Sequence, residues 1–379
     1  MKTDRTIFAI AFWVLILIWA PLALLNQDDD LSLEARTLLG WPEWNWDTAW
    51  EQHTYAATSA ALEDRIPLRT TLVGFRSRLA RAGLIPNPFD KVVFGQGDWL
   101  YVATSFDPHC PEPERVAIAD RLDTVATLLA DHGIELVIAM VPNKASIHQD
   151  GIPDWIRTEH DAAQVATSDM RSRLRDQGTW FLDLFPSMRA KQQSQPDVPL
   201  YYPTDTHWTI DGGSVFIEML VNHLQPGLYN DSEIMLVQEV PANLDLDRLS
   251  GSSEQRLLRY YQAVRPGTDV VTETPGTTIP STITTKTGND ERLIPGRTLL
   301  IRDSFWDHVV AVGREYFAEL VSVHANDAMD VMALATEMAR ADTVIFETGE
   351  RKFCEVMQST IASDAFLEHL RAALARRDR

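Results

Sequence analysis

Short apolar runs alternate with helix-like segments through the second half of the chain, and this alternation limits the possible folds more than any other feature. Strands are expected at residues 135–141, 180–184, 298–301, 320–324 and 343–347. Helices are expected near residues 113–131, 162–176, 210–224 and 328–339, and from residue 353 onward. Strands separated by helices imply a mostly parallel sheet with helices on both faces. The sequence therefore predicts a three-layer α/β/α domain.

Residues 236–297 interrupt this alternation. The segment is polar and rich in Thr, Pro and Gly, with a Thr-rich run at residues 272–287. We interpret it as an insertion of irregular or β structure in the catalytic domain. It either shapes a substrate groove or is a solvated excursion from the fold.

The N-terminus carries an unbroken apolar run at residues 7–25, which is long enough to cross a bilayer. Lys2 and Arg5 precede the run and Asp28 follows it, so the N-terminus is expected in the cytoplasm and the rest outside. We expect residues 1–26 to be an uncleaved transmembrane signal-anchor, with a cleaved signal peptide as the alternative. Residues 27–85 are expected to form a tether and a basic helix, and residues 86–379 the main domain.

The composition excludes some functions and leaves others open. A net charge of −20 argues against nucleic acid as a partner, because phosphates would be repelled. The two cysteines, Cys110 and Cys354, either pair in an oxidising compartment or remain two buried thiols. No spacing of cysteine and histidine indicates a structural metal site, and we expect no cofactor.

Two short motifs supply residues for nucleophilic catalysis. Asp205 and His207 precede the expected helix at residues 210–224, and Ser304 follows the expected strand at residues 298–301. A serine hydroxyl is a weak nucleophile and needs a base, which His207 can provide while Asp205 fixes its tautomer. By itself the Asp205–His207 pair is better explained by a loop whose Thr209 caps the following helix, and it could also supply two metal ligands.

Other residues fall near the same expected strand ends. The backbone N–H of Ser304 and the side chain of Asn143 are candidate oxyanion donors. The candidates for substrate binding are Asn143, Lys144, Tyr202, Trp208, Arg302 and Arg351. Three further histidines are interpreted as surface or core residues: His109, His148 and His308.

Several motifs in a fixed order resemble those of the AlgJ/AlgX-like alginate O-acetyltransferases, which have an SGNH-hydrolase-like domain. They are Glu63-Asp64-Arg65, Lys91-Val92-Val93-Phe94-Gly95, Val141-Pro142-Asn143-Lys144, Asp205-Thr206-His207-Trp208-Thr209 and Asp303-Ser304-Phe305. The resemblance extends from about residue 60 to the C-terminus. It implies a periplasmic enzyme that transfers acetyl groups to an exopolysaccharide, with Ser304, His207 and Asp205 as its triad. It also implies a membrane-bound O-acyltransferase as acetyl donor, kept close by the anchor in the inner membrane.

The chain departs from the alginate type at Arg302, where that type often has glycine. This departure affects the expected geometry of the oxyanion hole and the expected identity of the polymer. Three other functions compete with acetyl transfer: a polysaccharide acetylesterase with the same triad, a non-catalytic scaffold of an export complex, and a metallohydrolase with Asp205 and His207 as ligands.

Overall fold

The computed structural model describes residues 39–48, 50–64, 69–87, 90–108, 110–288 and 290–377. The chain divides into two compact units. The smaller comprises the described residues up to Phe94 together with Ala242–Arg256, and the larger comprises Gly95–Pro241 with Leu257–Arg379. The predicted anchor at residues 1–26 lies outside the described residues. Within the described residues, no helix combines the length and the apolar character needed to cross a membrane.

The smaller unit contains helices α2 (Gln52–Asp64), α3 (Arg69–Arg81) and α9 (Asp245–Leu249) and strand β1 (Val92–Phe94). The basic helix that the sequence predicts is α3, with Arg78 and Arg81 in its last turn, where positive charge favours a helix. Arg81 donates hydrogen bonds to the buried Asp247 Oδ1 at 2.8 Å and to Ser250 Oγ at 3.0 Å. The arginines of this helix are therefore not all solvated, because Arg81 ties α3 to the α9 segment.

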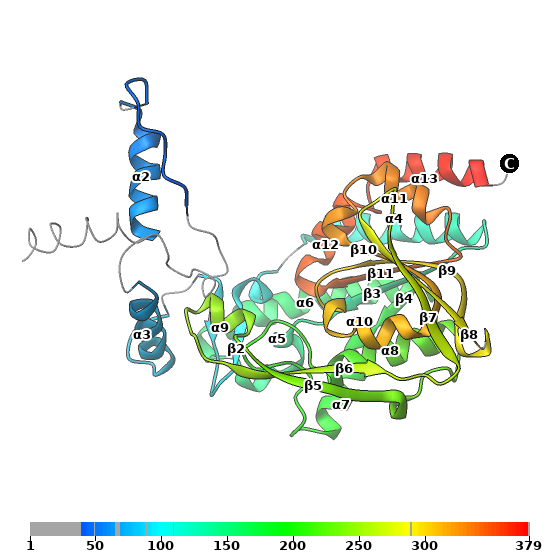
Figure 1. Cartoon of the computed structure of the whole chain (residues 1–379), viewed down its shortest axis with the longest axis horizontal. Helices are drawn as coiled ribbons and strands as arrows, with labels where there is room; N and C mark the ends of the chain where they lie inside the picture. The colour runs from blue at the N-terminus through cyan, green and yellow to red at the C-terminus, as the bar shows by residue number, and fades with distance from the viewer. Residues whose placement is uncertain are drawn as a thin grey trace, which may run out of the picture. The chain divides into compact units, whose positions relative to one another are not determined.

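A seven-stranded sheet runs through the described part of the larger unit (Figure 1). Its strands are β4 (Phe181–Asp183), β3 (Glu135–Val141), β11 (Thr343–Gly349), β9 (Ile294–Arg302), β10 (Phe317–His324), β8 (Ser281–Gly288) and β7 (Thr268–Pro275), in that spatial order. The first five strands are parallel to one another, whereas β8 pairs antiparallel with both β10 and β7. The sheet is thus mixed, with the predicted parallel strands as its centre.

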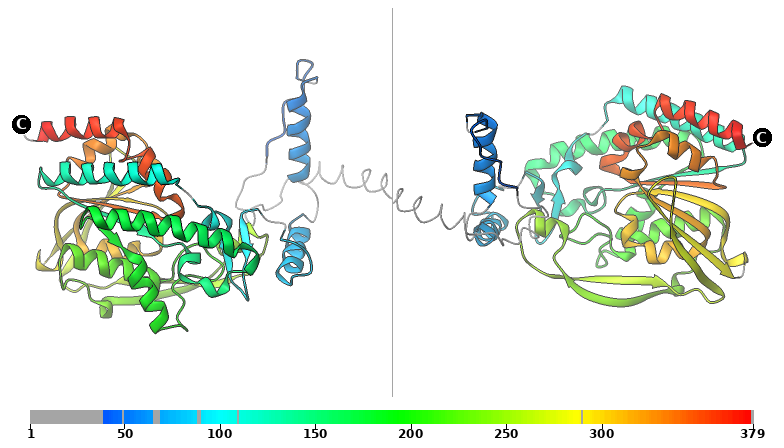
Figure 2. Two further views of the ribbon diagram at one scale, coloured as in Figure 1. Left: turned by 180° about the vertical axis from the view of Figure 1, so that it is seen from behind. Right: turned by 45° about the horizontal axis from the view of Figure 1, so that its top comes forward.

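Alternate side chains of the central strands enter two hydrophobic cores, one on each face of the sheet. In β3, Ile138 enters the first core, and its neighbours Val137 and Ala139 enter the second. Helices α4 (Glu112–Ala130), α6 (Arg157–Gln177), α11 (Val331–Met338), α12 (Phe353–Ser359) and α13 (Asp364–Arg377) contribute to the first core. Helices α7 (Leu184–Ser194), α8 (Ile210–Leu224) and α10 (Val310–Gly313) contribute to the second (Figures 1 and 2). This burial of both faces confirms the three layers that the sequence predicts.

The insertion at residues 236–297 is largely β structure. Strands β5 (Ile234–Ala242) and β6 (Arg256–Ala263) form a separate two-stranded sheet. The Thr-rich part forms β7 and β8, which extend the main sheet beyond β10. The Thr-rich segment is therefore not an irregular excursion. Strand β2 (Leu100–Val102) and the short helix α5 (Lys144–Ile147) complete the larger unit.

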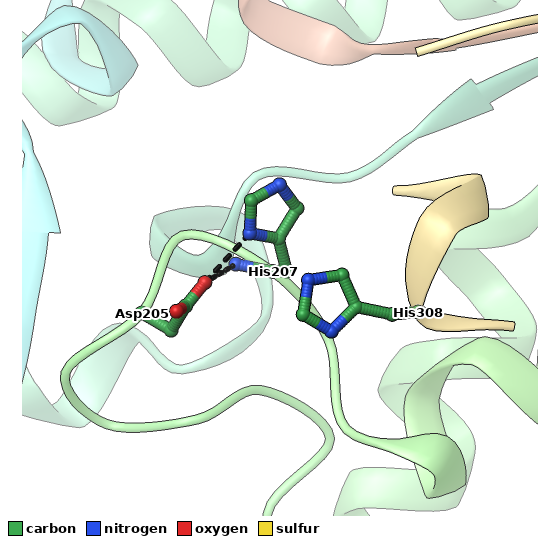
Figure 3. Close-up of side chains that lie close together, drawn as sticks. All are labelled: Asp205, His207 and His308. Atoms are coloured by element: carbon green, nitrogen blue, oxygen red, sulfur yellow. Dashed lines mark hydrogen bonds and ion pairs between the residues drawn. The ribbon is translucent and has the colours of Figure 1, made fainter. Parts of the chain in front are cut away.

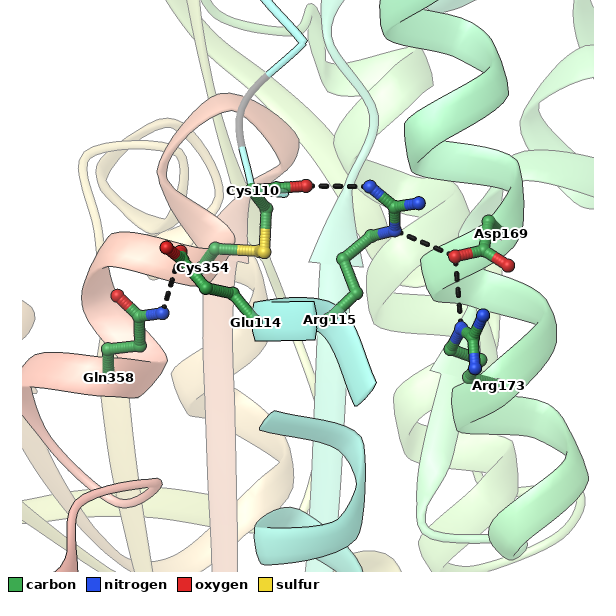
Figure 4. Close-up of a disulfide and its surroundings, with 7 residues drawn as sticks. All are labelled: Cys110, Glu114, Arg115, Asp169, Arg173, Cys354 and Gln358. Carbon is green, nitrogen blue, oxygen red and sulfur yellow. Dashed lines mark hydrogen bonds and ion pairs between the residues drawn. A yellow bond between two sulfur atoms is a disulfide. The ribbon is translucent and has the colours of Figure 1, made fainter. Parts of the chain in front are cut away.

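Cys110 and Cys354 form a disulfide, with their Cα atoms 5.9 Å apart (Figure 4). The bond joins the segment just before α4 to α12, and its two cysteines are 244 residues apart in the sequence. Cys110 has a φ of 80°, and Arg115 donates to its carbonyl at 2.7 Å. A crosslink over such a long loop is expected to stabilise the fold by roughly 2–5 kcal/mol. Of the two alternatives that the sequence left open, the structure adopts the paired one.

Candidate active site

The carboxyl ends of three adjacent strands bring the candidate residues to one edge of the sheet. Gly349 of β11 lies beside Val141 of β3, and Phe346 of β11 lies beside Ile301 of β9. The loops that leave these strands carry the Asn143-Lys144 pair, the segment Glu350–Lys352 and Ser304. This is the edge at which parallel α/β sheets build their sites.

The segment between α7 and α8 supplies the other half of the site. Its ends pair through an isolated bridge between Tyr201 and Trp208, and the Tyr202 N–H donates to the His207 carbonyl at 3.3 Å. Thr209 is the N-cap of α8 and accepts from the Gly212 N–H at 3.4 Å. The predicted cap is thus confirmed. It coexists with the Asp205–His207 pair, because the loop curls back on itself before the helix begins.

Asp205, His207 and Ser304 form one hydrogen-bonded chain. His207 Nδ1 lies 2.6 Å from Asp205 Oδ1, which also accepts the backbone N–H of His207 at 3.0 Å (Figure 3). His207 Nε2 lies 2.8 Å from Ser304 Oγ. With a proton on Nδ1, the ring can accept the Ser304 proton at Nε2. This is the geometry of an activated serine nucleophile.

Asp205 is a buried carboxylate held in its charged form. Burial alone would raise the pKa of Asp205, but the hydrogen bonds and charge of His207, with a smaller contribution from His308, hold that pKa well below its usual value. Asp205 is therefore ionised at neutral pH. It can stabilise the imidazolium that forms when His207 takes a proton.

His308 packs directly against the ring of His207. The two imidazoles stack with centroids 4.4 Å apart and planes at 21° (Figure 3). Burial and the neighbouring His207 lower the pKa of His308 to about 4, so its ring is neutral at neutral pH. The sequence analysis placed His308 among surface or core histidines and missed this contact. The one local signal was its position four residues after Ser304, one helical turn away.

The same three side chains are the candidates for holding a metal ion. One ligand atom each from Asp205, His207 and His308 lies within 4.8 Å of the others. An imidazole binds a metal in the plane of its ring, and an ion shared by two stacked rings would lie well out of both planes. Both nitrogens of His207 already face a partner, Asp205 or Ser304. The arrangement suits proton transfer better than metal ligation.

The turn Asp303–Phe305 holds the serine at the end of β9, and we call it the nucleophile turn. Asp303 Oδ1 accepts the Phe305 N–H at 2.8 Å, and Asp303 Oδ2 accepts the Gly349 N–H at 2.7 Å. The Ser304 N–H has no hydrogen-bond partner within the part of the chain that the structure describes. A donor left over beside the nucleophile can bind an oxyanion.

Asn143 and Arg351 lie together on the neighbouring strand ends. Asn143 is buried, its N–H donates to Glu350 Oε2 at 2.7 Å, and its Oδ1 is 3.4 Å from Arg351 Nη1. The Arg351 guanidinium is 5.6 Å from the ring centre of Phe305, the residue after the nucleophile. Arg351 thus borders the nucleophile turn, and Asn143 lies next to Arg351.

Lys144 does not face a substrate. It is only 4% exposed, and its ammonium donates to the backbone carbonyls of Tyr202, Pro203 and Asp205 at 3.1, 2.8 and 2.7 Å. The same ammonium lies near the rings of Trp99 and Tyr101. Lys144 therefore fixes the loop that carries Asp205, and the predicted contact with substrate is wrong for this side chain.

Replacing Lys144 with methionine is expected to lower the free energy of unfolding by about 3 kcal/mol or more, because three carbonyls lose a charged donor. The turnover number should fall as well, since the Asp205 loop loses its anchor. Lys191→Met is the matched control, because Lys191 donates to one carbonyl, that of Asp211, at 3.0 Å. Urea denaturation of both variants measures the difference. Equal stability losses would contradict an anchoring role for Lys144.

The remaining three candidates divide between core and rim. Trp208 is fully buried and donates to the Phe305 carbonyl at 3.0 Å, so it cannot stack on a sugar. Tyr202 is half-buried, and its ring lies 6.4 Å from that of His308. Arg302, which stands where the alginate type often has glycine, forms an ion pair with Asp307 at 2.8 Å. The positive charge that this residue adds is thus neutralised by a neighbouring carboxylate.

Comparison with known proteins supports the family resemblance. Residues 92–269 match the family model described as SGNH hydrolase-like domain, acetyltransferase AlgX. A probable alginate O-acetylase AlgJ of Azotobacter vinelandii is 26% identical over 151 residues, which cover 39% of this chain and 37% of that protein. The match thus spans little more than a third of this relative.

Two solved structures share the fold. Bacillus cereus PatB1 with a sulfonyl adduct superposes with a TM-score of 0.52 at 13% identity, over 73% of this chain and 98% of PatB1. Pseudomonas aeruginosa AlgX superposes with a TM-score of 0.50 at 14% identity, over 81% of this chain and 70% of AlgX. These two structures confirm the predicted α/β fold. The match to the family model and to AlgJ confirms the predicted family resemblance.

Proposed function

Because the chain resembles the AlgJ/AlgX-like proteins, we propose that it transfers acetyl groups to hydroxyl groups of an exopolysaccharide through an acyl-enzyme on Ser304. The observation that carries this proposal is the chain of short contacts from Asp205 through His207 to Ser304 Oγ. A non-catalytic scaffold would have no need for these contacts.

The first half of the reaction loads the enzyme. Ser304 Oγ attacks the acetyl carbonyl of the donor while His207 Nε2 takes the hydroxyl proton. The negative charge that develops on the carbonyl oxygen is stabilised by the Ser304 N–H, with the Asn143 side chain as the second candidate donor. Collapse of the tetrahedral intermediate breaks the bond to the leaving group, which receives the proton from His207. Acetyl-Ser304 remains.

The second half of the reaction transfers the acetyl group from Ser304 to the sugar. A sugar hydroxyl gives its proton to His207 and attacks the acetyl carbonyl, and Ser304 Oγ leaves with that proton. Tyr202 at the rim is the candidate for stacking on the sugar ring, and Arg351 is the candidate for binding an acidic sugar. If water took the place of the sugar hydroxyl, the same residues would catalyse ester hydrolysis.

Location and partners form part of the same proposal. We propose a periplasmic position, with residues 1–26 as the anchor in the inner membrane and a membrane-bound O-acyltransferase as the acetyl donor. The Cys110–Cys354 disulfide supports an oxidising compartment, because disulfides persist there and are rare in the cytosol.

The test uses the purified full-length chain with p-nitrophenyl acetate as donor and alginate oligomers as acceptor. We expect mass spectrometry to find acetyl groups on the oligomers and, in their absence, on the peptide that contains Ser304. Neutral oligosaccharides serve as the comparison acceptor. Release of acetate without any acetylated oligomer would indicate an esterase, and the absence of acetyl-Ser304 with full activity would contradict the acyl-enzyme mechanism.

A further inference from the structure

A second carboxyl group lies beneath the nucleophile turn and takes no part in the triad. Glu347 is near the end of β11 and is 0% exposed. Its Oε2 accepts the Asp303 N–H at 3.1 Å. Its Oε1 is buried and has no hydrogen-bond partner among the described residues.

Fully buried Glu347 interacts with the neighbouring acid Asp303, which is half-buried. Asp303 receives two backbone N–H groups, one on each oxygen. Glu347 receives one N–H, and a charge spread onto its partnerless Oε1 would be costly in a buried place. Two adjoining carboxyl groups rarely ionise together. The proton of the pair therefore belongs on Glu347.

The electrostatic surroundings agree with this assignment. Burial, followed by the charge of Asp303, raises the pKa of Glu347 well above its usual value. The hydrogen bond from the Asp303 N–H and, to a smaller extent, the charge of Arg302 oppose this effect without outweighing it, and the Arg302 guanidinium is paired with Asp307.

We propose that Glu347 is a protonated carboxylic acid that positions the nucleophile turn by accepting the Asp303 N–H. The positioning role rests on the proposed function of Ser304, whereas the protonation state does not. A neutral acid here has a chemical advantage over a carboxylate. It fixes the turn without adding a second negative charge near the carbonyl oxygen that becomes anionic during acetyl transfer.

The test compares two replacements of Glu347 that have a similar side-chain volume but differ in whether they can accept the Asp303 N–H. In Glu347→Gln a neutral amide oxygen still accepts the Asp303 N–H, and kcat should stay within about 3-fold of the wild-type value. In Glu347→Leu the acceptor is lost, and kcat should fall about 10- to 100-fold with little change in KM, because the loss is in positioning rather than binding. The exposed Glu355→Gln is the control.

Infrared difference spectroscopy tests the proton directly. The C=O stretch of a protonated carboxylic acid is separate from carboxylate bands, and it should be present in the wild type at neutral pH and missing in Glu347→Gln. A spectrum in which Glu347→Gln removes a carboxylate band instead would overturn the proposal. So would a Glu347→Gln variant that is folded and as slow as Glu347→Leu.

Labelling of Ser304 by a sulfonyl fluoride tests the positioning role of Glu347 independently of whether the protein transfers acetyl groups. The labelling rate reports the position and activation of the hydroxyl without any acetyl transfer. If the wild type is labelled and the leucine variant is labelled at the same rate, Glu347 has no positioning role. If the wild type transfers no acetyl group yet shows the expected infrared band and labelling difference, the proposed function fails and the inference on Glu347 stands.

Discussion

Replacing Ser304 with alanine is expected to lower kcat/KM for acetyl esters at least about 10³-fold, because the variant can form no acyl-enzyme. The change removes one oxygen from a half-buried side chain whose hydroxyl contacts His207, so little stability should be lost. Hydrolysis of p-nitrophenyl acetate measures the rate, and intact-mass analysis measures the acetylated fraction.

Ser194→Ala is the matched control for this experiment. Its hydroxyl is exposed and donates to the Lys191 carbonyl at the end of α7, well away from the nucleophile turn in sequence. The control should keep full activity. If the Ser304 variant also keeps it, the nucleophile has been assigned to the wrong residue and the acyl-enzyme mechanism falls with it.

Most elements of the central fold could be predicted from local patterns in the sequence. Strands β3 and β11 are mostly apolar because both faces of the sheet are covered, and such runs are recognisable without any knowledge of their neighbours. Helix α8 has a cap, an apolar face and a clear end, and its bounds are those that the sequence predicts. Helix α7 was missed. Its cap, Asp183, lies in strand β4, so that strand and helix share one short stretch of sequence.

The last two strands of the sheet, β8 and β7, could not be predicted in the same way. Both are polar and Thr-rich, and their place is fixed by the pairing of β8 with β10 and of β7 with β8 rather than by burial of both faces. Buried Lys286 of β8 forms an ion pair with Glu315, which lies in a distant part of the sequence. A long-range partner of this kind leaves no local pattern in the chain.

In the candidate site, too, some residues could be predicted from local patterns, whereas the roles of others depend on long-range contacts. Asp205, His207 and Ser304 could be proposed because each motif follows or precedes a recognisable element, and the structure brings them into contact. The match to the family model ends at residue 269, before Ser304, so the place of the nucleophile rests on geometry. The roles of Lys144 and His308 depend on contacts with a distant loop. The local sequence gives no sign of the first role, and for the second it offers only the spacing of His308 from Ser304.

Replacing Asp205 with asparagine is expected to lower kcat on the order of 10³- to 10⁴-fold while the fold is kept. Asparagine has nearly the same shape but lacks the charge that stabilises a protonated His207. Its amide can also turn its NH₂ group toward Nδ1, which would place the ring proton on Nε2, where His207 must instead accept the proton of Ser304. Esterase kinetics measure the loss, and Asp211→Asn in the first turn of α8 is the control.

The same variant tests the electrostatic assignment through stability. Because the folded-state pKa of Asp205 is held below its usual value, its ionised form stabilises the fold above the unfolded-state pKa. That contribution is lost as the pH falls through the folded-state pKa. The wild type should therefore lose more stability than Asp205→Asn between neutral and strongly acidic pH, as followed by denaturant unfolding. Parallel curves for the two proteins would mean that His207 does not stabilise the charge on Asp205, and the triad would lose its electrostatic basis.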